Sequence, residues 1–419
     1  MAFGLETGPE NVVSIKVVGV GGGGCNAVNR MISAGVKGAE FITMNTDAQA
    51  LLQSDAEVKI DLGDELTRGL GAGSDPMVGR KAAEENEDTI REALEGSDMV
   101  FVTAGEGGGT GTGAAPIVAR VARSLDALTV GIVTRPFAFE GPRRGQVAQQ
   151  GIEDLRKEVD ALIIIPNDRL LQIADKNVSY LDAFRIADDV LRSGVQGITD
   201  IIKVAGDMNV DFRDVNTIMR GAGTALMGIG TAQGEDRALR AAEAAISSPL
   251  LETRIDGAHG ALINVQGASD MGLAEINAAV SLIGESLHEE ANIIFGTVID
   301  DSLGDEMRVT VIAAGFDEEE ASAQPAPAMP TRTVQTSEPV EKPAYERPLG
   351  SLPTAQSAQP AQPAHRAEVK PPTRESNFPS ATPRRSEPVE EPSSDRFEVP
   401  RIFDEDDSKD QLDLPDFLR

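Results

Sequence analysis

The sequence predicts an α/β protein that has a parallel sheet, a long core helix, a smaller α+β C-terminal domain and a disordered tail. Apolar, β-branched runs alternate with helical periodicity up to residue 177, as expected for a parallel sheet covered by helices on both faces. A helical pattern without a strong break follows at 178–203. The composition then changes near residue 316, because 17 of the 24 prolines and only one of the 42 glycines lie beyond it.

Individual elements follow from the same patterns. Short apolar runs bounded by polar or glycine residues predict buried strands at 14–20, 40–45, 98–103, 128–134 and 160–165. Helical spacing between them predicts helices at 24–34, 78–95 and 114–124. Pro116 is expected in the first turn of the last helix, where its missing N–H costs nothing. Beyond the core helix, less regular patterns predict helices at 211–220, 235–246 and 272–288, and strands at 260–266, 292–299 and 307–314.

The chain is therefore expected to divide into six segments. These are a flexible N-terminus, a sheet domain, the core helix, a C-terminal domain, a disordered linker and a docking peptide, at residues 1–11, 12–177, 178–203, 204–316, 317–403 and 404–419. The linker has too few large apolar groups to offset the entropy of ordering. The final stretch is either an ordinary acidic tail or a docking motif for a partner groove. We favour docking, because four large apolar residues follow an acidic run: Leu412, Leu414, Phe417 and Leu418.

Charge and cysteine content exclude several classes of function. The chain has 68 acidic and 38 basic residues, a net charge of −30, which argues against binding a nucleic-acid backbone. A single cysteine, Cys25, allows no intrachain disulfide and favours a reducing compartment. No signal peptide is expected, and no apolar run approaches the roughly 20 residues that cross a membrane.

Three glycine-rich loops predict a phosphate site. Residues 19–24 (GVGGGG) satisfy G-x-G-x-x-G between a strand and a helix, which equally fits a dinucleotide-binding domain or a tight turn without ligand. Residues 107–113 (GGGTGTG) form a denser cradle of amides and hydroxyls, and residues 67–74 add a third loop. Together they predict a Rossmann-like domain that encloses a polyphosphate. No Gly-Lys dipeptide occurs, so a P-loop is excluded.

The loops and their surroundings resemble the tubulin/FtsZ family in its FtsZ form. The stretches that carry the resemblance include VVGVGGGGCNAVNRM (17–31), TRGLGAGSDPMVGRKAA (67–83) and FVTAGEGGGTGTGAAP (101–116). The similarity extends over about residues 12–317, and the terminal DLPDFLR is similar to the docking tail of the family. The resemblance implies a cytoplasmic GTPase that assembles head to tail into filaments of the division ring. It also implies that Mg²⁺ takes part and that the tail binds a membrane-attached adaptor.

The resemblance assigns roles to residues around the nucleotide. It places the phosphates on Gly22, Gly23, Gly24, Gly109, Thr110 and Gly111, with Ala72 and Gly73 facing the γ-phosphate. Glu140 and Arg144 correspond to ribose and nucleotide contacts, Asn26, Asn167 and Asp188 to nucleoside contacts, and Phe184 to the ring on the base. Chemistry supports Asp188 independently, because a carboxylate can accept both the N1–H and the N2–H₂ donors of guanine. Cys25 is counted with the nucleotide-binding residues of its loop, and it is interpreted there as a small residue that fits rather than as a reactive thiol.

Candidate catalytic acids lie away from these loops. Asp211 and Asp214 are three residues apart and share a face at a helix start, where Asn209 or Asp211 could also serve as the N-cap. In the family this segment enters the nucleotide site of the next subunit, and its acids orient the attacking water and help to hold the cation. The chain departs from the family at Asp207 and Arg213. A filament scaffold with little hydrolysis therefore stays open, as does, more remotely, a dinucleotide-dependent oxidoreductase.

Overall fold

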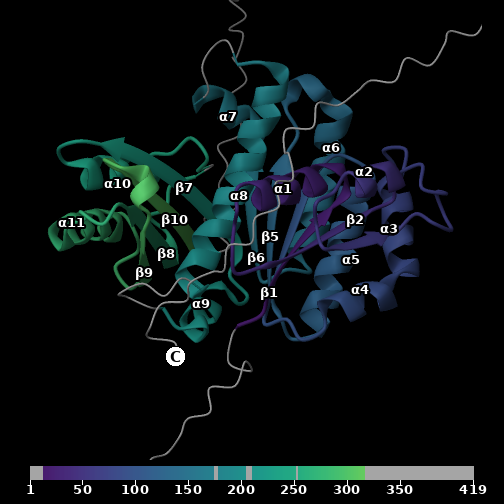
Figure 1. Cartoon of the computed structure of the whole chain (residues 1–419), viewed down its shortest axis with the longest axis horizontal. Coiled ribbons are helices and arrows are strands. Elements are labelled where there is room, and N and C mark those ends of the chain that lie inside the picture. Colours follow the sequence, from purple (N-terminus) through teal and green to yellow (C-terminus); the bar gives the residue numbers. More distant parts are fainter. Residues whose placement is uncertain (1–12, 174–177, 204–209, 252, 317–419) are drawn as a thin grey trace, which may run out of the picture. The chain divides into compact units, whose positions relative to one another are not determined.

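The strand and helix patterns fold into one ten-stranded sheet in the computed structural model, which describes residues 13–173, 178–203, 210–251 and 253–316 (Figure 1). The strand order is β3-β2-β1-β4-β5-β6-β7-β10-β8-β9. All described residues belong to one compact unit. The expectations for the N-terminus, the linker and the docking peptide lie outside the described residues.

The first six strands pair in parallel and form the sheet of the N-terminal domain. They are β1 (Ile15–Val20), β2 (Glu40–Asn45), β3 (Val58–Asp61), β4 (Met99–Gly105), β5 (Leu128–Arg135) and β6 (Ala161–Pro166). Every residue of β1 and β6 is buried, as expected for strands covered on both faces. This continuous burial explains why these strands are apolar throughout rather than alternating.

Helices cover both faces of the parallel strands. On one face, α1 (Gly21–Ser33) and α8 (Tyr180–Lys203) share a core with β1, β4 and β5. On the other face lie α3 (Pro76–Glu85), α4 (Glu87–Leu94), α5 (Thr110–Ser124) and α6 (Pro142–Arg156). The short helices α2 (Ala48–Leu52), η2 (Ala138–Glu140) and α7 (Asn167–Ile173) follow β2, β5 and β6. The predicted α/β class is therefore confirmed.

The core helix α8 runs the length of the N-terminal domain. Its 24 residues span about 36 Å. Its first turns lie beside α1, where Asp188 pairs with Arg30, and its last residue, Lys203, lies beside Gly38 just before β2. It therefore connects the carboxyl end of the parallel strands to their amino end.

The C-terminal domain continues the sheet with mixed strand directions. Its elements are α9 (Phe212–Met219), β7 (Gly223–Gln233), α10 (Arg237–Ile246), β8 (Ala258–Gly267), α11 (Leu273–Gly284), β9 (Asn292–Ile299), η3 (Asp301–Leu303) and β10 (Glu306–Phe316). Strand β10 pairs antiparallel with β7 and β8, whereas β9 is parallel to β8. Helices α10 and α11 pack on this sheet around a separate core. The mixed pairing agrees with the predicted α+β domain.

Several predicted boundaries are wrong for local reasons. Helices α1 and α5 begin at Gly21 and Thr110, inside the glycine loops rather than after them. Pro116 is consequently the seventh residue of α5 and not part of its first turn. The pattern at 78–95 forms two helices, because the chain leaves helical geometry at Asn86.

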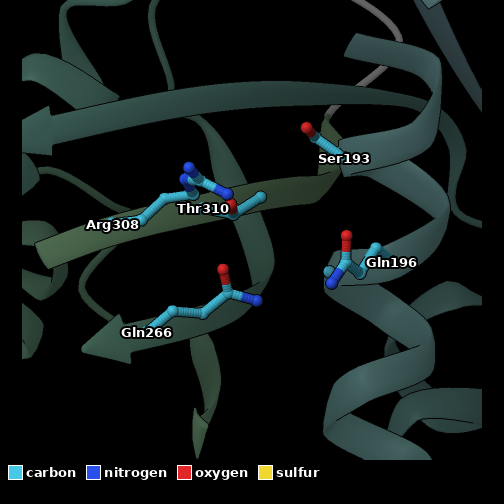
Figure 2. A pocket seen from close by; sticks show the side chains of 6 residues that line it. Ser193, Gln196, Gln266, Arg308 and Thr310 are labelled. Atoms are coloured by element: carbon cyan, nitrogen blue, oxygen red, sulfur yellow. The ribbon is translucent and has the colours of Figure 1, made fainter. Parts of the chain in front are cut away.

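A polar seam joins α8 to the C-terminal sheet. Figure 2 shows Ser193 and Gln196 on α8 facing Gln266, Arg308 and Thr310 on β8 and β10, around a hollow of about 10 Å³. Deeper in the seam, Gln266 donates to Asp200 at 3.0 Å. Burial raises the pKa of the Asp200 carboxyl to about 6. The hollow is too small for a ligand and holds at most a water molecule. The polar residues around it couple α8 to the C-terminal domain through hydrogen bonds such as that between Gln266 and Asp200.

Candidate nucleotide site

The three glycine loops meet at the carboxyl end of the parallel strands. A side chain on Gly21 would come within 2.6 Å of the Gly111 nitrogen, and one on Gly109 within 2.8 Å of the Ala72 Cβ. The Thr46 and Thr110 hydroxyls lie 2.6 Å apart and join the residue after β2 to the start of α5. The loops therefore pack backbone against backbone, and this arrangement requires glycine at their contacts irrespective of any ligand.

Two helix N-termini converge in these loops. Gly22, Gly23 and Gly24 lie in the first turn of α1, while Thr110 and Gly111 begin α5 behind Gly109 at its N-cap. Neither helix start has a side-chain cap or an acidic residue in its first turn. Their backbone N–H groups and partial positive charge are thus free for an anion.

Open space remains in front of two glycines, although the φ of +59° at Gly73 already favours glycine there. A Cβ on Gly22 or on Gly73 would meet no atom within 4 Å, and Gly22 has ordinary helical geometry. At Gly108 the nearest atom would be Arg144 Nη2, at 4.0 Å. The absence of side chains at these solvent-accessible positions leaves the backbone amides of the loops open to solvent, where a polyphosphate could reach them.

A hollow lies between α1 and α8. Its volume is about 660 Å³, which is ample for a nucleoside. The structure brings three predicted nucleoside contacts together here: Asn26 of α1 and Phe184 and Asp188 of α8. Arg30, whose Nε is 3.5 Å from Asp188 Oδ2, also lines the hollow. Burial raises the pKa of the Asp188 carboxyl to about 6, and the nearby Arg30 cation limits the rise.

An aromatic cluster stands beside Phe184. Phe137 stacks on Phe139 with ring centroids 4.9 Å apart, and Phe184 meets the edge of Phe137 at 5.2 Å. Tyr180 closes the cluster, 5.0 Å from Phe184. Phe137 is buried, but Phe139 and Tyr180 are more than half exposed, at 57% and 65%. The neighbouring rings hold the Phe184 ring in place and extend the apolar surface around it. Of these four aromatic residues, the sequence predicted only Phe184 as part of the site.

The remaining predicted contacts occupy the same end of the sheet. Glu140 and Arg144 form an ion pair at 2.7 Å, and Glu140 also accepts a hydrogen bond from the Phe137 backbone. Asn167 begins α7 and is buried, and its Oδ1 has no hydrogen-bond partner among the described residues. A buried, unpartnered amide oxygen is costly unless a ligand satisfies it, so Asn167 also fits a nucleoside contact.

Cys25 is held in the interior of α1. Its side chain is buried, and burial raises the pKa of the thiol to about 11. The Asn45 amide lies 3.8 Å from the sulfur. A buried thiol with a raised pKa is a poor nucleophile, in keeping with a packing role.

The candidate catalytic acids lie at the opposite end of the strands. Asp211 is the N-cap of α9 and accepts from Arg213 N at 3.1 Å, and Asp214 follows in the first turn. The end of α9 is anchored by Arg220, which pairs with Asp126, two residues before β5 begins. In Figure 1, α7 lies at the top and α9 at the bottom. The structure therefore does not bring Asp211 and Asp214 to the loops of the same chain; Asn209 lies outside the described residues.

Sequence reasoning missed two charged residues at the site. Nothing in the sequence around Arg30 indicated a role for its side chain. Its pairing with Asp188 depends on how α1 packs against α8. Glu106, just before the loop 107–113, is 2% exposed. Its position at a strand end gave no sign that the carboxyl is enclosed by α6.

The fold and the glycine loops define an α/β protein of the nucleotide-binding class whose sequence contains no P-loop motif. The model of the GTPase domain of the Tubulin/FtsZ family matches residues 14–175, and that of the FtsZ C-terminal domain matches residues 223–317.

Solved structures agree with the family models. An FtsZ from M. jannaschii, in a structure described as an empty dimer, is 44% identical, with a TM-score of 0.70 over 72% of this chain and 88% of that one. A point mutant of FtsZ from M. jannaschii is also 44% identical, with a TM-score of 0.71 over 73% of this chain and 91% of that one. CetZ2 from Haloferax volcanii, a GTPγS-bound protofilament, shares the fold at 20% identity and a TM-score of 0.63, over 73% of this chain and 94% of that one. The chain therefore belongs to the FtsZ family of tubulin-like GTPases.

Proposed function

We propose that the chain assembles head to tail into cytoplasmic filaments of the division ring during septum formation, and that each subunit completes the GTPase site of its neighbour. The observation that carries this proposal is the separation of the two halves of the chemistry. The amide-lined loops lie at one end of the strands, and Asp211 and Asp214 lie at the other. A contact that repeats head to tail joins opposite ends of successive subunits. Relatives described as a dimer and as a protofilament support self-association.

Each part of the nucleotide has candidate partners in this arrangement. The amides around Gly22, Gly23, Gly24, Gly109, Thr110 and Gly111 would bind the phosphates, with Ala72 and Gly73 nearest the γ-phosphate. Asp188 would accept from guanine, Phe184 would pack on the base, and Asn26 and Asn167 would bind the nucleoside. Glu140 and Arg144 would contact the ribose and the phosphates.

The neighbouring subunit supplies the acids for hydrolysis. Asp211 and Asp214 would orient the attacking water from the start of α9, with Asn209 just before them. A positioned acid of this kind contributes about 10²–10⁴-fold to a rate. The dependence of turnover on the contact follows directly, because the acids reach GTP only across an interface.

Mg²⁺ fits this site without a protein cage. Among the described residues no group of three or more His, Cys, Asp or Glu side chains could hold a metal ion. Mg²⁺ typically uses substrate phosphates, waters and one or two carboxylates. The exposed acids at the start of α9 could contribute such a carboxylate, and the ion would neutralise charge on the phosphates.

The domain boundaries and the tail belong to the same proposal. We assign GTP binding to residues 12–177, the core helix to 178–203 and activation to 204–316, followed by a linker and a docking peptide. The tail would bind a membrane-attached adaptor through Leu412, Leu414, Phe417 and Leu418. Among the described residues, no helix has the length and apolar character to cross a membrane. Deleting 410–419 should abolish adaptor binding and spare GTP turnover; equal adaptor binding would refute this role for the tail.

The alternative, a filament scaffold with little hydrolysis, has one observation in its favour. Arg213 lies between the two acids at the exposed start of α9, where its cation could pair with either of them and reduce their action on water. Within the described part of the chain Arg213 contacts Asp211 through its backbone N–H and not through an ion pair, and we therefore favour hydrolysis.

The test is GTP turnover per subunit measured against protein concentration, with Mg²⁺ present. We expect a specific activity near zero at low concentration that rises above a threshold. A flat specific activity would mean that each subunit carries a complete site, and the shared-site proposal would be wrong. Filaments that form without phosphate release would favour the scaffold.

A further inference from the structure

Glu106 is a buried acid beneath the loop 107–113 that none of the roles above uses. It follows the last residue of β4, and its backbone N–H donates to Thr134 O of β5 at 3.0 Å. Its side chain is 2% exposed, and neither carboxyl oxygen has a hydrogen-bond partner of ordinary geometry among the described residues. Such a carboxyl is costly to ionise in place.

Helix α6 encloses this carboxyl at a glycine. A Cβ on Gly151 would overlap both Glu106 Oε2 and Thr112 Cγ2, so only glycine lets the helix approach so closely. Thr112 connects the acid to the loop, because its hydroxyl accepts from the Gly107 N–H at 2.9 Å. Glu106 therefore packs between the fixed end of β4, the first turn of α5 and α6.

Among the residues that the structure describes, no positive charge acts on the pKa of this carboxyl. The charged residues of the surrounding elements are Arg135 on β5, Arg120 and Arg123 on α5, and Arg143, Arg144, Glu153, Asp154 and Arg156 on α6. Burial and the Thr112 hydroxyl, and none of these charges, set the direction of the pKa shift of Glu106. Arg144 pairs with Glu140, and Arg120 pairs with Glu87. Burial raises the pKa of the Glu106 carboxyl to about 8, and the Thr112 hydroxyl offsets a part of the rise.

We infer that Glu106 is a positioning residue that supports the phosphate-binding loop in its uncharged form, and that ionisation of its carboxyl weakens nucleotide binding. Two physical effects act in the same direction. A carboxylate at this place must gain water or a partner, which separates α6 from the loop. A negative charge under the loop also repels the phosphates that its amides attract. The inference rests on the proposed phosphate role of residues 107–113.

The sign of the pH dependence follows from linkage. Below about pH 8 the carboxyl is protonated, and nucleotide binding has its full strength. As the pH rises through about 8, the free protein loses the proton, whereas bound phosphates favour keeping it. Nucleotide binding should therefore take up a proton near this pH and weaken by up to about tenfold per pH unit above it.

The experiment compares the full-length chain with Glu106→Gln, which keeps the shape and cannot ionise. GDP affinity is measured below the assembly concentration on both sides of pH 8. Asp160→Asn is the matched control, a buried acid at the amino end of the same sheet. We expect the dissociation constant to rise with pH in the wild type and Asp160→Asn, relative to Glu106→Gln. Titration of GDP itself is common to all three proteins and cancels in the ratios.

A second measurement on the wild type covers the case in which Glu106→Gln does not fold. Calorimetry of GDP binding near pH 8, in two buffers of different ionisation enthalpy, should show proton uptake beyond that of GDP. Parallel pH profiles for the wild type and Glu106→Gln, or no excess proton uptake, would overturn the inference and leave the proposed function intact. No GDP binding at any pH would instead overturn the proposed function.

Discussion

The two ends of the parallel strands differ in what they present to solvent. At the carboxyl end, two helix N-termini expose backbone amides, and no acidic residue stands in the first turn of either helix. At the amino end, α9 begins with Asp211 and Asp214, and Asp211 already caps the helix with its own carboxylate. The starts of α1 and α5 thus leave their backbone N–H groups available to an external anion, whereas α9 uses the Asp211 carboxylate to cap its own N-terminus.

The difference agrees with the proposal that the GTPase site is completed between two copies of the chain. Acids near the loops would repel the phosphates that the amides bind, while hydrolysis benefits from an acid that orients water. Placing the acids about the length of α8 away resolves this conflict, provided that a neighbour delivers them. The predictions below test how strictly the two ends divide the work.

The largest expected effect comes from removing an acid at the amino end. Asp214→Ala should lower GTP turnover of the assembled protein by about 10²-fold or more, because the attacking water loses its orientation. GDP affinity of the isolated subunit should not change. The measurements are phosphate release above the assembly threshold and nucleotide affinity below it, with Asp88→Asn, another exposed acid in a first helical turn, as the control.

Mixing two inactive variants gives a sharper form of this test. Asp188→Ala keeps α9 intact, and Asp214→Ala keeps the nucleotide end intact. In an equal mixture about one quarter of head-to-tail contacts would join two intact ends, so turnover should recover in part. A mixture no more active than either variant alone, although both assemble, would contradict a site shared between subunits.

The next effect concerns base recognition at the carboxyl end. Asp188→Asn should weaken GTP binding by about 100-fold, because guanine loses two charge-assisted hydrogen bonds. Xanthosine carries a carbonyl in place of the 2-amino group, so the Asn amide can donate to it and binding of XTP should improve. The measurement is the ratio of GTP to XTP affinity in the two proteins, and an unchanged ratio would remove Asp188 from the base site.

The same carboxyl sets an acid limit to binding. Burial raises its pKa to about 6, and only the carboxylate accepts both guanine donors. GTP affinity should therefore be full above about pH 6 and fall as the pH drops below it, by up to about tenfold per unit. Asp188→Asn should lack this acid limb, and with Glu106 at the alkaline side the wild-type profile should be bell-shaped.

The sequence was sufficient for elements whose pattern is local. Strand β9 was predicted at its observed bounds, and α8 within two residues, because uninterrupted apolar or helical periodicity needs no tertiary information. Strand β7 was missed, since its glycines reduce its β-character. Gly228 and Gly230 are required by the close approach of α10, which the sequence does not reveal. Likewise, α5 begins inside a run of glycine and threonine that has low helix propensity but receives support from tertiary packing.

For the site, the residues of the loops were predictable and their partners were not. The motif 107–113 indicated a phosphate cradle, but the enclosure of Glu106 depends on Gly151, 45 residues later in the chain. The Arg30 contact with Asp188 and the ring cluster around Phe184 depend in the same way on packing between elements distant in sequence. Such contacts leave no periodic trace in the sequence.

The smallest expected effect separates glycines that the fold needs from those that a ligand needs. A Cβ on Gly21 would meet Gly111 backbone at 2.6 Å with a φ of +70°, whereas a Cβ on Gly22 would meet nothing within 4 Å. Gly22→Ala in the first turn of α1 should therefore leave folding intact or stabilise it by up to about 1 kcal/mol. If phosphates fill this space, the added methyl should nevertheless weaken GDP binding, by about tenfold.

Gly145→Ala is the matched control for this last test, because Gly145 is also helical, exposed and free of contacts at its Cβ. It should raise the thermal unfolding temperature about as much as Gly22→Ala does and leave GDP affinity unchanged. Because stability rises in both variants while affinity falls in only one, a loss of binding in Gly22→Ala cannot be ascribed to a damaged fold. Equal GDP affinity in the two variants would mean that the amides of α1 do not closely approach the phosphates, and the carboxyl end of the sheet would then owe its binding to the loop 107–113 alone.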